Sequence, residues 1–207
     1  MTTLIGYSII HDLEAVRQDL NRFSNAFLTK TVALRHDRSK QKYLSIAGKV
    51  LLYKMLQKLK LSPSDLLRKM VYNKNGKPII ENSKVNFNIS HVESFVCCTV
   101  STEAVGIDVE KESKAKMLKR VSPKVYSRIP FVINTIEDWI KLEARLKCLG
   151  TGLSGLFTVN PSRINKLYCK RIEVPYPYMI AFACKEDLDT EVIEYKESEL
   201  FELKPIL

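Results

Sequence analysis

Apolar and polar residues alternate along several short stretches of this chain, which is the pattern of β-strands with one buried face. In residues 106–110 the alternation puts Ile107 and Val109 on one face and Asp108 and Glu110 on the other. The apolar pair is expected to enter a core. The two carboxylates then project side by side from the opposite face of a short strand.

Further strands are predicted where apolar residues alternate or cluster: residues 2–10, 85–91 and 95–100, and a group within 157–185. Helical spacing of apolar residues instead predicts helices over residues 13–27, over a long segment that follows the basic run 35–42, and over about 134–149. The long second helix carries its apolar side chains at Leu44, Ala47, Leu51, Met55 and Leu59. Gly48 on this helix allows another element to approach closely.

The helix at 134–149 is predicted to pack one apolar stripe inward, formed by Ile136, Trp139, Leu142, Leu146 and Leu149. Gly150 and Gly152 follow it and are expected to end it in left-handed geometry. Glu143 and Lys147 lie four residues apart on a neighbouring flank of the helix. Taken alone, they form an ordinary exposed ion pair.

Composition narrows the class of protein. The chain has 207 residues, 45% of them hydrophobic, and has no apolar run long enough to cross a membrane. It begins without a basic and apolar leader, so a cytoplasmic location is expected. Five cysteines, an odd number, and three scattered histidines favour neither a disulfide framework nor a zinc site.

The formal net charge of +10 favours an acidic partner. No nucleic-acid-binding motif is present, and the lysines are spread along helices rather than interleaved with aromatic residues. A polyphosphate ligand or an acidic protein therefore fits the charge better than a nucleic acid.

The acid pair Asp108 and Glu110 has two interpretations. Two neighbouring carboxylates repel each other, so in a cleft they call for a cation between them, and oxygen ligands suit Mg²⁺. Alternatively, the pair is a solvated strand end with two ordinary surface acids. The five-residue pattern alone favours the second interpretation.

Four further motifs change that balance: Gly76-Lys-Pro78, Phe87-Asn-Ile-Ser-His91, Trp139-Ile-Lys-Leu-Glu-Ala-Arg-Leu-Lys147 and Gly150-Thr-Gly-Leu153. With the acid pair, and in this order and spacing, the chain resembles the 4′-phosphopantetheinyl transferases. The resemblance is to the larger, two-lobed type that activates peptide and polyketide synthases. It runs from about Arg35 to Leu153.

The resemblance implies an α+β fold of two similar lobes related by a pseudo-twofold axis. Each lobe would be a small antiparallel sheet packed on a long helix, with the active site in the cleft between them. The N-terminal lobe would span residues 1–102 and the C-terminal lobe residues 103–207, in a monomer.

The resemblance also implies the reaction. A serine of an acidic acyl or peptidyl carrier protein would receive 4′-phosphopantetheine from coenzyme A, and 3′,5′-ADP would leave. Mg²⁺, or Mn²⁺ in its place, would bind to Asp108, Glu110 and Glu143. Glu143 would also help to remove the serine proton, and Lys147 would stabilise the leaving phosphate.

Coenzyme A itself would lie on the N-terminal lobe. By the same resemblance, Lys77 and Pro78 lie against its adenosine end, while Ser90 and His91 hydrogen-bond to a phosphate. Two basic residues before the long second helix, Arg35 and Arg38, would approach the 3′-phosphate. Without the resemblance, the Gly-Lys-Pro segment is a plain turn and a lone histidine is usually structural.

The chain departs from the family at two positions. Leu142 stands where the family has a lysine before the glutamate, and Ile140 replaces a small hydroxyl residue. Lys141 is one residue earlier, about 100° around the helix, so it cannot simply take over. Leu142 is predicted to be buried. These departures keep two alternatives open: a coenzyme A or nucleotide-binding module that has lost catalysis, and a basic interaction protein with surface acids.

Overall fold

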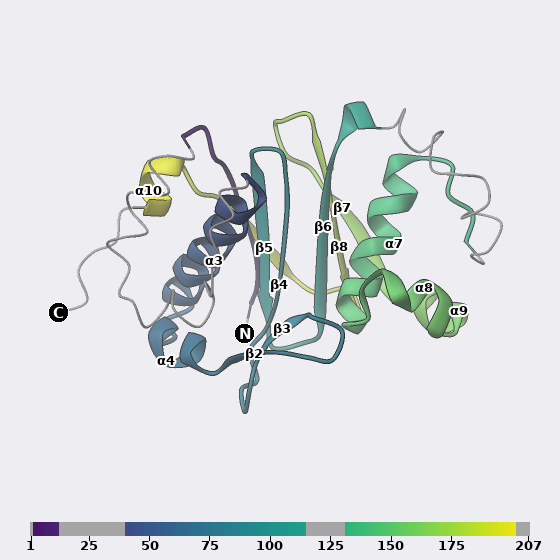
Figure 1. Cartoon of the computed structure of the whole chain (residues 1–207), viewed down its shortest axis with the longest axis horizontal. Helices are drawn as coiled ribbons and strands as arrows, with labels where there is room; N and C mark the ends of the chain where they lie inside the picture. Colours follow the sequence, from purple (N-terminus) through teal and green to yellow (C-terminus); the bar gives the residue numbers. More distant parts are fainter. Residues whose placement is uncertain (1, 13–39, 115–130, 202–207) are drawn as a thin grey trace.

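Two β-sheets pack face to face between two long helices in a computed structural model of the chain (Figure 1). The structure describes residues 2–12, 40–114 and 131–201. From one side to the other, the layers are α3 (Lys40–Lys58), a four-stranded sheet, a three-stranded sheet and α7 (Ile136–Leu149). The predicted α+β class is confirmed at this level.

The first sheet has the strand order β4-β5-β1-β9. Its strands are β1 (Thr3–Ile9), β4 (Asn86–Val92), β5 (Phe95–Ser101) and β9 (Thr190–Glu194). Neighbouring strands are antiparallel except β1 and β9, which run parallel. The expectation of a purely antiparallel sheet is therefore wrong at this edge, because the last strand returns from the far side of the molecule.

The second sheet has the order β6-β8-β7 and is antiparallel throughout. It consists of β6 (Val105–Lys111), β7 (Tyr168–Ile172) and β8 (Tyr178–Cys184). Helix α7 covers its outer face, as α3 covers the outer face of the first sheet (Figure 1).

Short elements connect these layers. They are α4 (Pro63–Arg68), the hairpin of β2 (Met70–Tyr72) and β3 (Pro78–Ile80), 3₁₀ turns at Glu112–Lys114 and Gly152–Ser154, and the helices α8 (Gly155–Thr158), α9 (Pro161–Asn165) and α10 (Glu197–Phe201). The helices α8 and α9 lie partly where strands were predicted, because short apolar runs do not distinguish a strand from a helix. The predicted helix at 13–27 lies outside the described residues.

Each interface between layers has its own apolar core. Between the two sheets, fully buried Ile5 and Phe95 of the first sheet meet Ile107 and Phe182 of the second. Between α3 and the first sheet, Gly48 allows the predicted close approach: a Cβ there would lie 2.5 Å from Cγ2 of Ile89. The strand β6 packs against the first sheet on one face and against α7 on the other.

The two predicted lobes are matched only in part by these layers. Residues 190–201 return to the first sheet and to α3. The division into 1–102 and 103–207 and the pseudo-twofold axis remain predictions. Among the described residues, no helix is long and apolar enough to cross a membrane, and all five cysteines are free thiols.

Candidate active site between β6 and α7

The predicted acid pair lies on β6, on the face that meets α7. Ile107 and Val109 are 0% and 2% exposed in the core between the sheets, as the alternation predicted. Asp108 on the opposite face is only 4% exposed, and Glu110 is half-buried. The interpretation of Asp108 as an ordinary surface acid is therefore wrong.

Asp108 is the centre of a compact polar cluster. Its Oδ1 accepts hydrogen bonds from Lys147 Nζ of α7 at 2.5 Å and from Ser90 Oγ of β4 at 2.9 Å. Lys147 Nζ also donates to Ser90 Oγ at 2.9 Å. Burial alone would lower the pKa of Lys147, but the ion pair with Asp108 raises it above its ordinary value. The cluster brings together three predicted site residues from three different elements.

Glu143, one turn before Lys147 on α7, completes the group of acids. Burial, and then the negative charges of Asp108 and Glu110, raise the pKa of Glu143 to about 8, whereas Lys147 acts in the opposite direction. The three carboxylates predicted from the sequence are therefore close enough to interact electrostatically. At neutral pH Glu143 holds a proton that an exposed glutamate would have lost.

The raised pKa of Glu143 predicts how stability depends on pH in the absence of divalent cations. Between about pH 4.5 and 8 the folded protein binds a proton at Glu143 that the unfolded chain has released, so the free energy of unfolding falls as pH rises through this window. Relative to Glu143→Gln, the wild-type Tm should fall by on the order of 5 °C between pH 5 and 8.5. Thermal melting in chelator tests this, and parallel pH curves for the two proteins would contradict it.

The close contact between β6 and α7 depends on Gly106. A Cβ at this position would lie 2.1 Å from the carbonyl oxygen of Ala144 and 2.4 Å from the nitrogen of Cys148. Both obstacles are main-chain atoms of α7, and they lie directly after Glu143 and Lys147 in the sequence. Gly106 thus lets α7 bring the side chains of Glu143 and Lys147 close to the acids of β6.

The donor set suits a hard divalent cation. Asp108 Oδ2 is buried and accepts no hydrogen bond from any residue that the structure describes. It lies in a group of three carboxylates that has Lys147 as its cation, an arrangement whose excess negative charge a divalent cation would neutralise. Within the described ranges, however, no three His, Cys, Asp or Glu side chains are already arranged around a common metal position. Asp108, Glu110 and Glu143 thus fit a metal chemically, with some adjustment of their side chains.

Helix α7 is well defined at both ends. Thr135 and Asp138 form a capping box at its start, and Gly150 ends it with φ of 70°, the predicted left-handed geometry. Between them the buried residues form two faces rather than the single predicted stripe. Ile136, Ile140, Ala144 and Cys148 face the second sheet, whereas Leu142 and Leu146 pack against Leu156 and Ile164. The second face is buried by α8 and α9, which the sequence pattern did not reveal.

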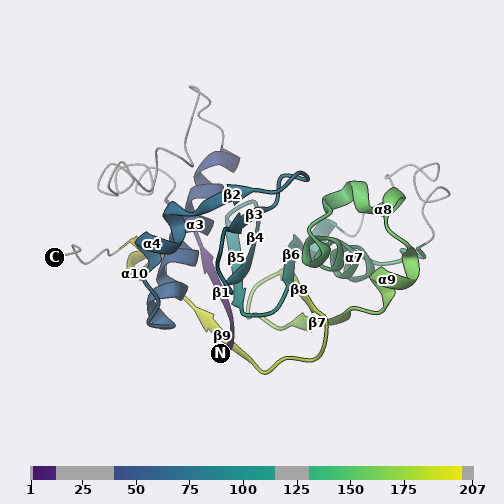
Figure 2. The same cartoon turned by 90° about the horizontal axis from the view of Figure 1, so that it is seen from below.

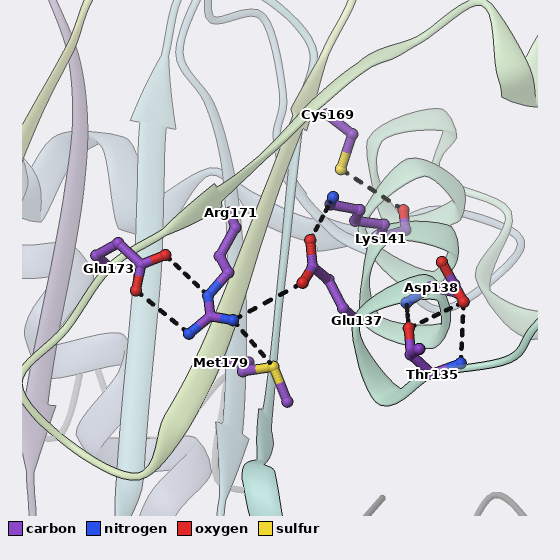
Figure 3. Close-up of polar contacts among 8 residues, drawn as sticks. All are labelled: Thr135, Glu137, Asp138, Lys141, Cys169, Arg171, Glu173 and Met179. Carbon is purple, nitrogen blue, oxygen red and sulfur yellow. Dashed lines mark hydrogen bonds and ion pairs between the residues drawn. The ribbon is translucent and has the colours of Figure 1, made fainter.

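Lys141 does not replace the lysine that the family has at position 142. Its Nζ forms an ion pair with Glu137 at 2.5 Å, and Glu137 also lies 3.7 Å from Arg171 of β7 (Figure 3). Arg171 contacts Glu173 at 3.0 Å as well, so this network holds the start of α7 against the sheet edge. Lys141 therefore belongs to a structural network away from Asp108, as the 100° offset predicted.

Leu142 is 4% exposed, which confirms its predicted burial. It packs in the apolar cluster with Leu146 and also lines a cavity of about 320 Å³ that Lys141 and Arg145 share. Leu142→Lys should therefore lower the free energy of unfolding by about 2–4 kcal/mol without raising turnover, because the new amine would enter an apolar contact. Melting curves and kinetics test this. Leu142→Met is the control, expected to cost less than about 1.5 kcal/mol, and a stable, much faster Leu142→Lys protein would contradict the expectation.

The residues predicted to bind coenzyme A separate into two places. Ser90 joins the Asp108 cluster, whereas neighbouring His91 points to the other face of β4 and is half-buried. Burial, and then the positive charge of Lys147, lower the pKa of His91, so at neutral pH its ring is an uncharged donor. Lys77 instead donates to the carbonyl oxygens of Val105 and Lys147, at 3.1 and 2.7 Å, and half-buried Pro78 begins β3. The structure shows no contact of Lys77 with Ser90 or His91.

Two predicted residues cannot be placed, and one cation was overlooked. Arg35 and Arg38 lie outside the described residues.

Lys49 of α3 is only 8% exposed, and burial lowers its pKa. No lysine of this helix was singled out from the sequence. The signal for Lys49 was its position between buried Ala47 and Leu51 and beside Gly48.

The chain is similar to a curated protein named 4′-phosphopantetheinyl transferase gsp, from Aneurinibacillus migulanus. The two are 27% identical over 158 residues, which is 67% of this chain and 64% of the relative. The chain thus aligns with somewhat less than two thirds of that protein's length. No model of a known protein family matches the chain.

Proposed function

We propose that this chain is a member of the 4′-phosphopantetheinyl transferase superfamily and transfers the phosphopantetheine arm of coenzyme A to a serine of a carrier protein, in line with its similarity to the transferase from Aneurinibacillus migulanus. The products would be the modified carrier and 3′,5′-ADP. The observation that supports this best is the group formed by Asp108, Glu110, Glu143 and Lys147. A site that cleaves a pyrophosphate needs acids to hold a divalent cation and a positive side chain to offset phosphate charge. The acids of β6, with the acid and the lysine of α7, would supply both.

The acids would hold a divalent cation, with Mg²⁺ as first choice and Mn²⁺ as a substitute. Asp108, Glu110 and Glu143 are its proposed ligands, and Asp108 Oδ2 is the oxygen left available among the described residues. When bound, such an ion neutralises charge on a pyrophosphate and lowers the barrier to displacement at phosphorus.

Two side chains of α7 are proposed to act on the reacting groups. Without a cation Glu143 holds a proton at neutral pH, but a divalent cation bound beside it would favour the carboxylate form, which would then assist removal of the serine proton. Lys147 remains protonated and would offset negative charge on the leaving phosphate. Its flexible stem allows the ammonium to move from Asp108 to a phosphate oxygen.

The substrates follow from charge and position. The net charge of +10 supports an acidic carrier protein as partner. Ser90 and His91 are proposed to donate hydrogen bonds to the coenzyme's phosphates, His91 as a neutral imidazole. Pro78 and the basic residues Arg35 and Arg38 stay proposed contacts of the adenosine end. A monomer in the cytoplasm is the proposed setting.

Mass spectrometry tests this function directly. Apo carrier proteins of the fatty acid, polyketide, peptide and aminoadipate types are incubated with the protein, coenzyme A and Mg²⁺. We expect at least one carrier to gain the mass of one phosphopantetheine and 3′,5′-ADP to appear, and we expect excess chelator to stop both. A carrier whose serine is replaced by alanine is the control. No mass gain in any carrier, or full activity in chelator, would overturn the proposal.

Burial of Leu142 and Ile140 favours one second candidate, a coenzyme A-binding protein that has lost catalysis. Both residues are apolar and buried where the family has a lysine and a small hydroxyl residue. Under this alternative, calorimetry would detect coenzyme A binding while the carriers stay unmodified. The two measurements together therefore distinguish the enzyme from the binding module.

A further inference from the structure

A turn of the N-terminal part of the chain lies on the C-terminal end of α7. The turn joins β2 to β3, and in Figure 2 this hairpin extends toward the helices of the C-terminal part. The side-chain amides of Asn73 and Asn75 both donate to the carbonyl oxygen of Gly150, at 3.2 and 2.9 Å. Lys77 Nζ donates to the carbonyl oxygen of Lys147 at 2.7 Å. Three side chains from one turn thus contact the last turn of the helix.

These contacts add donors to carbonyl oxygens at the helix end, where the carbonyl of Lys147 also accepts from the backbone N–H of Gly150 at 3.1 Å. The last carbonyl oxygens of an α-helix lack partners within the helix and carry partial negative charge. A lysine ammonium and two amides are suitable donors for them. Here the donors come from residues 70 to 77 positions earlier in the sequence, so tertiary contacts add to the left-handed backbone cap at Gly150.

Lys77 connects the helix end to the strand that carries the acids. Besides the carbonyl of Lys147, its Nζ contacts the carbonyl of Val105, the first residue of β6, at 3.1 Å. Three residues further along β6 is Asp108, which accepts a hydrogen bond from the side chain of the same Lys147. One ammonium group therefore fixes the main chain on both sides of the Asp108–Lys147 pair.

The turn is ordered by its own hydrogen bonds. Asn73 Oδ1 accepts from the backbone N–H groups of Asn75 and Lys77, both at 2.9 Å. The backbone of Asn73 also donates to the carbonyl oxygen of Lys77 at 2.9 Å, and Gly76 adopts φ of +80°. Because the turn has a fixed conformation of its own, its contacts can hold the end of α7 in one position.

We infer that the 73–77 turn is a tertiary cap that positions Lys147 for the reaction, and that Lys77 is a positioning residue rather than a coenzyme A phosphate ligand. The inference rests on the proposed function and deepens it. It replaces the sequence-based expectation that Lys77 contacts the coenzyme, because the Lys77 amine is turned toward two backbone carbonyls. Removing the cap should affect the chemical step more than coenzyme A binding.

The test compares Lys77→Met and Asn75→Ala with the wild-type protein. Lys77→Met keeps the stem of the side chain but removes its donors, and Asn75→Ala removes one uncharged donor at an exposed site. Lys74→Met is the matched control, since Lys74 is exposed in the same turn. The measurements are kcat and KM for coenzyme A, the Kd ratio of dephospho-coenzyme A to coenzyme A, and hydrogen exchange of backbone amides in residues 144–152.

In Lys77→Met we expect kcat to fall by about tenfold or more while KM stays within about twofold, because a small displacement of a reacting group is costly. The Kd ratio should not change, and amides 144–152 should exchange faster. Asn75→Ala should change in the same direction by about threefold. Lys74→Met should match the wild type in every measurement.

A Kd ratio that falls toward one in Lys77→Met, with unchanged exchange in both variants, would overturn the inference and make Lys77 a phosphate ligand. If Lys77→Met does not fold, unchanged exchange in Asn75→Ala overturns it equally. If the wild-type protein modifies no carrier, the proposed function fails, but binding and hydrogen exchange still decide the role of the turn. The two failures are therefore distinguishable.

Discussion

Asp108→Asn should abolish carrier modification, with turnover reduced at least about hundredfold, as for the loss of one preorganised electrostatic group. Asparagine has nearly the same shape but no charge, so the acids of β6 lose their most buried member. The variant also leaves Lys147 with an uncharged partner in a largely buried site. We therefore expect the free energy of unfolding to fall by about 3 kcal/mol, as when a buried ion pair is broken.

The matched control is Glu103→Gln, which removes one negative charge from the exposed turn just before β6. It should change neither turnover nor Tm measurably. Turnover is measured by mass gain of the carrier, and folding by circular dichroism at the assay temperature. Asp108→Asn that folds and retains wild-type turnover would contradict the assignment of Asp108 to the reaction.

Among substitutions that add a single methyl group in the site, Gly106→Ala should destabilise the folded protein most. Its Cβ would meet the main chain of α7 at 2.1 and 2.4 Å, and neither obstacle can move by rotating a side chain. The helix must shift away from β6, which lowers the free energy of unfolding by at least about 3 kcal/mol and Tm by on the order of 10 °C. The shift also carries Glu143 and Lys147 away from Asp108, so turnover should fall even at temperatures where the protein remains folded.

Gly48→Ala provides the comparison on the other long helix. There the obstacle is a side-chain methyl group, Cγ2 of half-buried Ile89, and not the main chain of a neighbouring element, and alanine favours the helix by about 1 kcal/mol. Its effect on Tm should therefore be smaller than that of Gly106→Ala, and turnover should stay closer to that of the wild type. Equal effects of the two substitutions would show that main-chain contact at Gly106 is not the limiting feature.

The sequence alone determined those features that depend on local spacing. Alternation in residues 106–110 placed Asp108 opposite Ile107 and Val109, because side chains of a strand point to alternate faces. Helical spacing placed Glu143 and Lys147 one turn apart, and Gly150 marked the end of their helix. The offset of Lys141 was equally local, and its ion pair with Glu137 agrees with it. The family resemblance was also visible at this level.

Only the tertiary structure decided what depends on contacts between distant segments. Asp108, Ser90 and Lys147 come from three elements. No local sequence pattern predicts that the amine of Lys147 donates to the side chains of both Ser90 and Asp108. The family resemblance implied that Lys77 contacts coenzyme A, whereas the fold shows its amine donating to the carbonyl oxygen of Lys147 at the end of α7, 70 residues away in the sequence. The second buried face of α7 and the return of β9 to the first sheet were likewise invisible, since each is created by packing partners far away in the chain.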